Sequence, residues 1–260
     1  MTLGEDARRI RAIIGEPPQA ARQALSRHGV LRAGINLSNF LLVSSRTADG
    51  GPAGVSPDMA AILAACLGLP LRYVPYESPG PLADAAERDE WDVALVGAEP
   101  QRAAVIDFTP AYTEIEATYL VPPGSALQSV AEVDRKGRRI AVAARTAYGL
   151  WLERNVQAAE LITGEGFDGA YRQFVDRKLD ALAGLRPKLI EDERTLPGSR
   201  MLPGRFMAVK QALGTPKASG AALAYLTSFV VAAIGSGIVA QLIARHGVTG
   251  LSVAGVDSGR

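Results

Sequence analysis

Apolar and polar positions after residue 30 repeat in the order strand, loop, helix. Continuous apolar runs predict buried strands at residues 30–35, 71–74, 91–96, 139–143, 160–162 and 181–185. Helical spacing of apolar residues predicts the intervening helices at 57–67, 82–88, 147–156, 169–177 and 188–193. Ser56 is the expected N-cap of the first of these helices. Strands that alternate with helices build parallel sheets, so the pattern predicts an α/β chain with two units in tandem.

Two segments that look extended, 117–121 and 206–211, separate these units, and the chain turns helical from 216 to 245. We expect the chain to cross from lobe 1 to lobe 2 near Thr118 and to return near Ala208, which makes a two-strand hinge. The predicted domains are an N-terminal helical extension over 1–28, lobe 1 over 29–118 plus 209–260, and lobe 2 over 119–208. Such an architecture favours ligand capture in a cleft between lobes.

The first 28 residues have a different pattern. Two short helices are expected there, separated by Pro17 and Pro18, with Ile10 and Ile13 at helical spacing in the first. The segment is charged and lacks the continuous apolar core of a secretory signal peptide. The sequence alone therefore indicates the cytoplasm, unless a leader is missing from it.

Composition narrows the classes of function. The 28 basic residues nearly cancel the 27 acidic ones, which argues against nucleic-acid binding. Cys66 is the single cysteine and is expected to be buried. The apolar stretch 223–243 is interrupted by Ser and Gly, so membrane insertion is not expected. We expect neither a metal nor a cofactor, and a monomer.

The most informative polar residues follow the predicted strand at 91–96. Gly97 allows a close approach of the backbone, and Glu99 and Arg102 come next. Parallel strands of open sheets bind ligands at their carboxyl ends, and the planar fork of Arg102 suits a carboxylate. The alternative for Arg102 is a surface salt bridge with Glu99 or Asp107.

Four segments together carry a family resemblance: LRAGIN, GVSPDMAAILAACLGLPLRYVP, WDVAL and EPQRAAVIDFTPAY. In this order and spacing the chain resembles the solute-binding proteins of family 3 from residue 31 to about 250. The resemblance implies the type 2 periplasmic-binding-protein fold, in which each lobe is a mainly parallel sheet flanked by helices. It also implies that Arg102 holds the carboxylate of a ligand, that the protein is periplasmic, and that an ABC transporter permease is a partner.

A second half-site is expected where the strand at 139–143 leads into a helix. Amides at a helix start suit an anion, so the Thr146 hydroxyl and the amides of Thr146 and Ala147 are candidate donors. Two positions depart from the family pattern. Arg145 occupies a turn that usually holds Gly and Ser or Thr, and Arg186 lies where many amino-acid binders have an acid for the ligand's ammonium. Either Glu99 serves the amine, or the ligand is an organic acid without one.

Further ligand contacts are expected from the loop after the first strand and from one tyrosine. Asn36 and Asn39 could donate hydrogen bonds, and Phe40 could stack on the ligand. Capping by the two asparagines and packing by the phenylalanine are the alternatives. Tyr112 could clamp the ligand, or could simply pack at the rim.

The function predicted from the sequence is therefore binding of a small carboxylate-bearing solute, an amino acid or an organic acid, without catalysis. Two alternatives stay open. A cytosolic metabolite-sensing protein would fit the missing leader, and a cyclohexadienyl-dehydratase-like enzyme would use Glu99 as a general acid.

Overall fold

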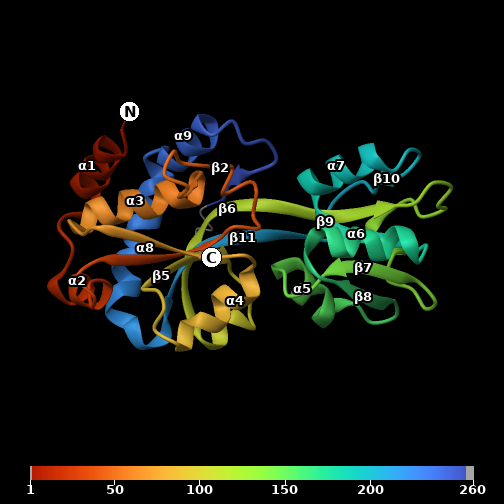
Figure 1. Cartoon of the computed structure of the whole chain (residues 1–260), viewed down its shortest axis with the longest axis horizontal. Helices are drawn as coiled ribbons and strands as arrows, with labels where there is room; N and C mark the ends of the chain where they lie inside the picture. The colour runs from red at the N-terminus through yellow and green to blue at the C-terminus, as the bar shows by residue number, and fades with distance from the viewer. Residues whose placement is uncertain (1, 256–260) are drawn as a thin grey trace. The chain divides into compact units, whose positions relative to one another are not determined.

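The computed structural model describes residues 2–255, apart from the side chain of Ala218, and divides them into two compact units. Unit 1 runs as far as Glu114 and resumes at Lys210, and unit 2 spans Ile115–Val209. Two strands pass from one unit into the other, β6 (Ile106–Val121) outward and β11 (Met207–Pro216) on the return (Figure 1). The sequence places the domain boundaries at 118/119 and 208/209, and these stay predictions. The two compact units differ from the predicted domains in one respect, since the N-terminal helices belong to unit 1.

The sheet of unit 1 has a parallel core. Strand β1 (Leu31–Asn36) lies between β4 (Leu71–Tyr76) and β5 (Val93–Gly97), and both pairings are parallel. Strand β11 then adds antiparallel to β5, with Gly214 opposite Ala94 and Gln211 opposite Gly97. The carboxyl ends of β1, β4 and β5 therefore share one edge of the sheet.

Helices and short strands complete unit 1. The helices that follow the strands are α3 (Val55–Leu67), α4 (Pro79–Asp84), α8 (Gly220–Gly235) and α9 (Ile238–Arg245). The short helices of 3-10 type are η1 (Ala85–Glu87), η2 (Arg102–Ala104) and η4 (Lys217–Ser219), and the minor strands are β2 (Ser45–Arg46), β3 (Pro52–Ala53) and β12 (Ser252–Val253). Among the described residues no single helix is long and apolar enough to cross a membrane; α8 and α9 reach that length and composition only together, across a bend of 68°.

Trp91 fixes the packing beneath this sheet. Its ring is fully buried among Leu82, Ala94 and Ile106, and its indole N–H donates to the Leu82 carbonyl at 3.0 Å. Gly34 on β1 lies against the same ring, where a Cβ atom would be 3.2 Å from the ring carbons. A large apolar side chain with one satisfied polar atom thus anchors α4 to β1 and β5.

The N-terminal helices α1 (Leu3–Ile14) and α2 (Gln19–Leu25) pack on α3 and α8. Ile10 is fully buried there, and the Cys66 thiol lies 3.5 Å from the Ala7 carbonyl oxygen. Cys66 is buried, as predicted from the sequence, and this burial raises the pKa of its thiol to about 12. Asp6 has no exposed surface and forms an ion pair with Arg245 at 3.4 Å. The extension is therefore an integral layer of unit 1.

Unit 2 has its own sheet. The second half of β6 pairs antiparallel with β9 (Ala181–Leu185), which is parallel to β7 (Arg139–Ala143), and β7 is parallel to β8 (Glu160–Gly164). Strand β10 (Arg200–Met201) joins the other side of β6. The helices are α5 (Ala147–Asn155), α6 (Gly166–Asp176), α7 (Arg186–Thr195) and the 3-10 helix η3 (Val130–Glu132). The α/β class predicted from the sequence is confirmed.

The start of α3 differs from the prediction. Gly54, not Ser56, occupies the N-cap position, with φ of 150°. A Cβ atom on residue 54 would lie 2.3 Å from the Leu42 carbonyl oxygen, so the close approach of the two chain segments requires glycine. Ser56 lies inside the helix and its hydroxyl bonds to Tyr112 instead, at 2.7 Å.

Candidate functional site

Three predicted site residues of unit 1 meet at the carboxyl end of β5. Gly97 ends the strand, Glu99 follows, and Arg102 begins the helix η2. The Nη1 atom of Arg102 donates to the Gly97 carbonyl at 2.7 Å, so its guanidinium turns back to the end of the strand. Only 4% of Arg102 is exposed, so its guanidinium is buried and does not lie on the surface.

Glu99 is buried beside this arginine. Its exposed fraction is 4%, and its Oε2 atom accepts a hydrogen bond from the Gln101 amide at 2.8 Å. The backbone continues this turn, since the Ala103 amide donates to the Glu99 carbonyl at 2.9 Å. Because the turn is held by its own hydrogen bonds, the carboxylate and the guanidinium are both fixed at one edge of the sheet.

The asparagines of the first loop have different roles. Asn36 ends β1, and its Oδ1 atom accepts from the amide and the hydroxyl of Ser38, at 3.2 and 2.8 Å. That is an Asx turn, so the capping alternative describes Asn36. Asn39 is 5% exposed, and its Oδ1 atom has no hydrogen-bond partner among the described residues. A buried oxygen without a donor costs about 1–3 kcal/mol, so Asn39 is the better candidate for a ligand contact.

Phe40 and Tyr112 differ in how deeply their side chains are buried. The Phe40 side chain is half-buried in the loop after β1. Tyr112 on β6 is fully buried, and burial raises the pKa of its phenol, against the smaller opposite effect of its bond to Ser56. The surroundings of Tyr112 are those of a packed core residue, and this geometry gives no support to the predicted ligand contact.

In unit 2 the predicted residues surround the start of α5. Arg145 is exposed and has a left-handed backbone, with φ of 57°. Thr146 is the N-cap: its hydroxyl donates to the Ala143 carbonyl at 2.9 Å and accepts from the Gly149 amide at 3.1 Å. The hydroxyl proton therefore already has an acceptor inside unit 2, and a contact of this hydroxyl with a ligand stays a prediction. The amide of buried Ala147, at the first helical position, stays a candidate.

Arg145 and Arg186 follow the carboxyl ends of two paired strands, β7 and β9. Strands β7 and β9 are paired with Ile140 opposite Ala181, so residues 145 and 186 follow the two strand ends at the same level. Arg186 is held by Glu116, whose Oε2 atom accepts from its Nε at 2.7 Å. Glu116 also accepts from Arg205, at 3.4 Å.

Glu116 was missed by the sequence reasoning. It directly precedes the segment 117–121, which was recognised only as an extended connection. Its place follows from the antiparallel pairing of β6 with β9, where Ala117 lies opposite Leu185. The acid at this edge therefore comes from a crossing strand. Among residues 2–255 no cluster of three or more His, Cys, Asp or Glu side chains could hold a metal ion.

A family model identifies the family, and solved structures show the fold. Residues 31–249 match the model of the bacterial extracellular solute-binding proteins, family 3. No curated protein matches the chain. Many solved structures share the fold. Three of them follow, and each is less than 20% identical in sequence to this chain.

One is the amino acid ABC transporter substrate-binding protein AbpA from Streptococcus pneumoniae bound to L-arginine, with 18% identity, a TM-score of 0.69, and coverage of 86% of this chain and 97% of that chain. A putative binding component of an ABC transporter from Wolinella succinogenes, complexed with lysine, gives 17%, 0.68, 84% and 95% for the same measures. The ancestral amino acid-binding protein AncCDT-1, described as a precursor of cyclohexadienyl dehydratase, gives 19%, 0.68, 86% and 97%.

Proposed function

The chain belongs to family 3 of the bacterial extracellular solute-binding proteins, and from this premise we propose that it binds one small carboxylate-bearing solute for an ABC-type importer. The observation that carries the proposal is Arg102, a buried cation turned toward the carboxyl end of β5. A guanidinium with five N–H donors and little exposure to water suits a planar carboxylate. Asn39, whose buried Oδ1 atom is a hydrogen-bond acceptor, supplies a second polar group in the same unit, one that suits an N–H of the ligand rather than its carboxylate.

The proposed mechanism uses both units. Unit 1 contributes Arg102 and Asn39, and unit 2 contributes Arg145 and the Ala147 amide from the start of α5. The two crossing strands, β6 and β11, are the proposed hinge. Contacts from both units to one ligand would favour the closed state, since only a difference in affinity between states shifts their populations.

The class of ligand depends on whether an amine is recognised. The relatives from S. pneumoniae and W. succinogenes are described with arginine and lysine. In this chain Glu99 is a buried carboxylate that could receive an ammonium. Arg145 in unit 2 supports instead a second anionic group on the ligand, whereas the charge of Arg186 is already paired with Glu116.

Isothermal titration against a set of L-amino acids and a set of organic acids tests the proposal. At least one compound with a free carboxylate should bind, and its amide should bind at least tenfold more weakly, because one charge-assisted hydrogen bond is typically worth about 1.5–3 kcal/mol. Equal affinity for an acid and its amide would contradict the carboxylate proposal. A binder set restricted to amine-free acids would identify the organic-acid class.

Binding, rather than catalysis, is the role that the relatives support. Those described above are binding proteins, and even the precursor of a dehydratase is described as an amino acid-binding protein. We also propose an extracytoplasmic location and a permease partner, which the family description supports. The alternative of a cytosolic metabolite sensor requires the opposite compartment for the same ligand chemistry.

A further inference from the structure

Unit 1 has a cavity of about 390 Å³ at the edge of its sheet opposite Arg102. Asp89 and Val105 line it, and they precede β5 and β6 respectively. Pro216, another lining residue, ends β11, which runs antiparallel to β5. The Lys217 amide joins this end of the sheet to the Val105 carbonyl at 3.3 Å. The cavity is therefore separate from the carboxyl ends of the parallel strands, where the proposed carboxylate site lies.

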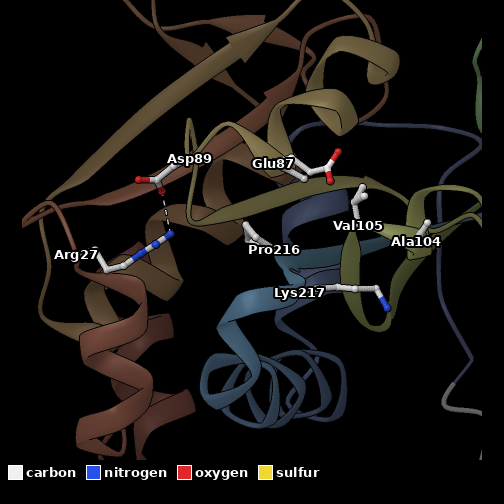
Figure 2. Close-up of a pocket in the computed structure, with 8 residues that line it drawn as sticks. Arg27, Glu87, Asp89, Ala104, Val105, Pro216 and Lys217 are labelled. Atoms are coloured by element: carbon white, nitrogen blue, oxygen red, sulfur yellow. Dashed lines mark hydrogen bonds and ion pairs between the residues drawn. The ribbon is translucent and has the colours of Figure 1, made fainter.

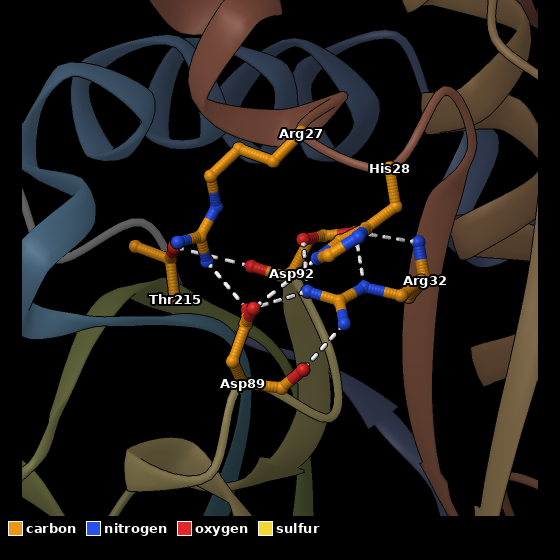
Figure 3. Close-up of polar contacts among 6 residues, drawn as sticks. All are labelled: Arg27, His28, Arg32, Asp89, Asp92 and Thr215. Carbon is orange, nitrogen blue, oxygen red and sulfur yellow. Dashed lines mark hydrogen bonds and ion pairs between the residues drawn. The ribbon is translucent and has the colours of Figure 1, made fainter.

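One wall of the cavity is held rigidly by a network of charges (Figure 3). The Oδ1 atom of Asp89 accepts from Arg27 at 2.8 Å and from Arg32 at 2.7 Å. Arg32 is 4% exposed and also grips Asp92, through contacts of 2.8 and 3.1 Å. Asp89 itself has a left-handed backbone, with φ of 53°. Because Arg27 and Asp89 satisfy each other, this wall is ordered without any ligand.

The rest of the lining is an apolar surface between two charges that the network leaves out (Figure 2). Ala86, Val105 and Pro216 supply the apolar part. Glu87 is exposed, and within residues 2–255 its carboxylate forms neither a hydrogen bond nor an ion pair. The ammonium of Lys217 forms a loose ion pair with Asp107, at 3.8 Å, and both side chains keep contact with solvent. The cavity thus presents an anionic acceptor, Glu87, and a cationic donor, Lys217. Within the described residues these two side chains form no ion pair with each other.

We propose that this cavity is a second small-molecule site, and that its ligand is a zwitterion of the amino-acid class. The ligand's ammonium pairs with Glu87, its carboxylate pairs with Lys217, and its aliphatic body covers Val105 and Pro216. The volume lies within the range of small-ligand pockets, about 300–1,000 Å³. Arg27, which completes the ordered wall, precedes the residues matched by the family, 31–249. One lining residue of the cavity therefore comes from the N-terminal extension, and the others lie within the matched residues.

The test uses 5-aminopentanoate as the probe, followed by amide and methyl NMR shifts of the full chain carrying Arg102→Ala. That substitution weakens the proposed carboxylate site, so that binding at the cavity is read separately. The probe should shift Ala86, Ala104 and Val105 in a saturable way. Pentylamine and pentanoate, each with only one of the two charges, should bind several-fold more weakly. Equal affinity for all three compounds, or shifts absent from these residues, would overturn the proposal.

Substitutions of the two charges give the matched comparison. Glu87→Gln and Lys217→Gln should each weaken the probe by roughly three- to fivefold, the effect of a solvent-exposed ion pair. The same changes at exposed sites of unit 2, Glu153→Gln and Lys136→Gln, should leave its affinity unchanged. If the two pairs of variants behave alike, the cavity does not recognise a zwitterion. Because Glu87 and Lys217 are exposed, these variants should stay folded, which an unchanged reference spectrum verifies.

Discussion

Arg32 shows how a charged side chain is stabilised in the interior of unit 1. Arg32 begins the sheet of unit 1 and is almost fully buried, yet both oxygens of Asp92 and one of Asp89 accept from its guanidinium. These bonds, above all those to Asp92, raise the pKa of Arg32 above its ordinary value. The hydrogen bond from Arg32, followed by that from His28, lowers the pKa of Asp89. Removing one partner of such a group leaves an uncompensated charge.

Asp89→Asn should therefore destabilise unit 1 at neutral pH by about 1 kcal/mol, a modest value because the Asp89 side chain is about half exposed. Asparagine also tolerates the left-handed backbone, so the change removes charge and little else. Folding lowers the pKa of Asp89, so its stabilisation is present above the ordinary carboxyl pKa and is lost as the pH falls through the folded-state value. Urea denaturation should show the difference at neutral pH, and the difference should shrink as the pH falls below the ordinary carboxyl pKa.

Glu77→Gln is the control for this comparison, since Glu77 is an exposed acid in the same unit. Its stability should follow that of the unmodified chain at neutral and at acid pH. A loss for Asp89→Asn that persists unchanged in acid would contradict the assigned ion pairs.

Single residues also show which parts of the candidate site could be predicted from the sequence. Arg102 follows a buried strand and precedes a recognisable segment, so its place was predictable from the sequence pattern. Whether a side chain points outward was not, because it depends on contacts with distant residues. Tyr112 turned inward to Ser56, and the Thr146 hydroxyl closed its own helix cap. Glu116 reached Arg186 across a strand pairing that spans 70 residues.

At the scale of elements, the helix α1 shows how the extension joins the fold. A capping box begins it: the Thr2 hydroxyl accepts from the Glu5 amide, and the Glu5 carboxylate accepts from the Thr2 amide. Its inner face packs on α3 and α8 with Ile10 fully buried, while Ile13, one turn later, is 60% exposed. Helical spacing alone predicts the same surroundings for both isoleucines. They differ in exposure because only Ile10 faces a neighbouring helix.

Ile10→Ala should lower the free energy of unfolding by about 2–4 kcal/mol, because the change opens a cavity between α1 and its neighbours. Ile13→Ala on the same helix is the matched control and should change it by less than about 0.5 kcal/mol. Chemical denaturation of the two variants side by side measures the difference. Equal small losses would mean that α1 does not pack on unit 1.

The strand and helix order of both units was predictable because apolar periodicity reports it locally. Element ends were less predictable: α3 begins at Val55 with a glycine cap, and α7 begins at Arg186, two residues before the expected start. Close approach of Gly54 to Leu42 decided the first of these ends. Contacts of that kind join segments that are distant in sequence, so local patterns do not contain them.

For the whole molecule, the two passages between units have a chemical consequence. Strand β6 carries Glu116 into unit 2, and β11 brings Lys210 back to unit 1, where its carbonyl accepts from the Ala98 amide at 2.8 Å. The predicted site residues fall in both units, with Arg102 in one and Arg145 in the other. The family membership of residues 31–249 makes solute binding the shared property, and the ligand's carboxylate is the specific claim.

The most direct test of that claim is calorimetric titration of the best ligand from the two-class screen into the unmodified chain, Arg102→Ala and Arg72→Ala. Arg72 is an exposed arginine on β4, so it controls for the loss of a positive charge from unit 1. Arg102→Ala should lose roughly 10- to 150-fold in affinity while keeping a cooperative melting transition, and Arg72→Ala should bind like the unmodified chain. If folded Arg102→Ala binds as tightly as Arg72→Ala, Arg102 does not hold the ligand and the account is wrong.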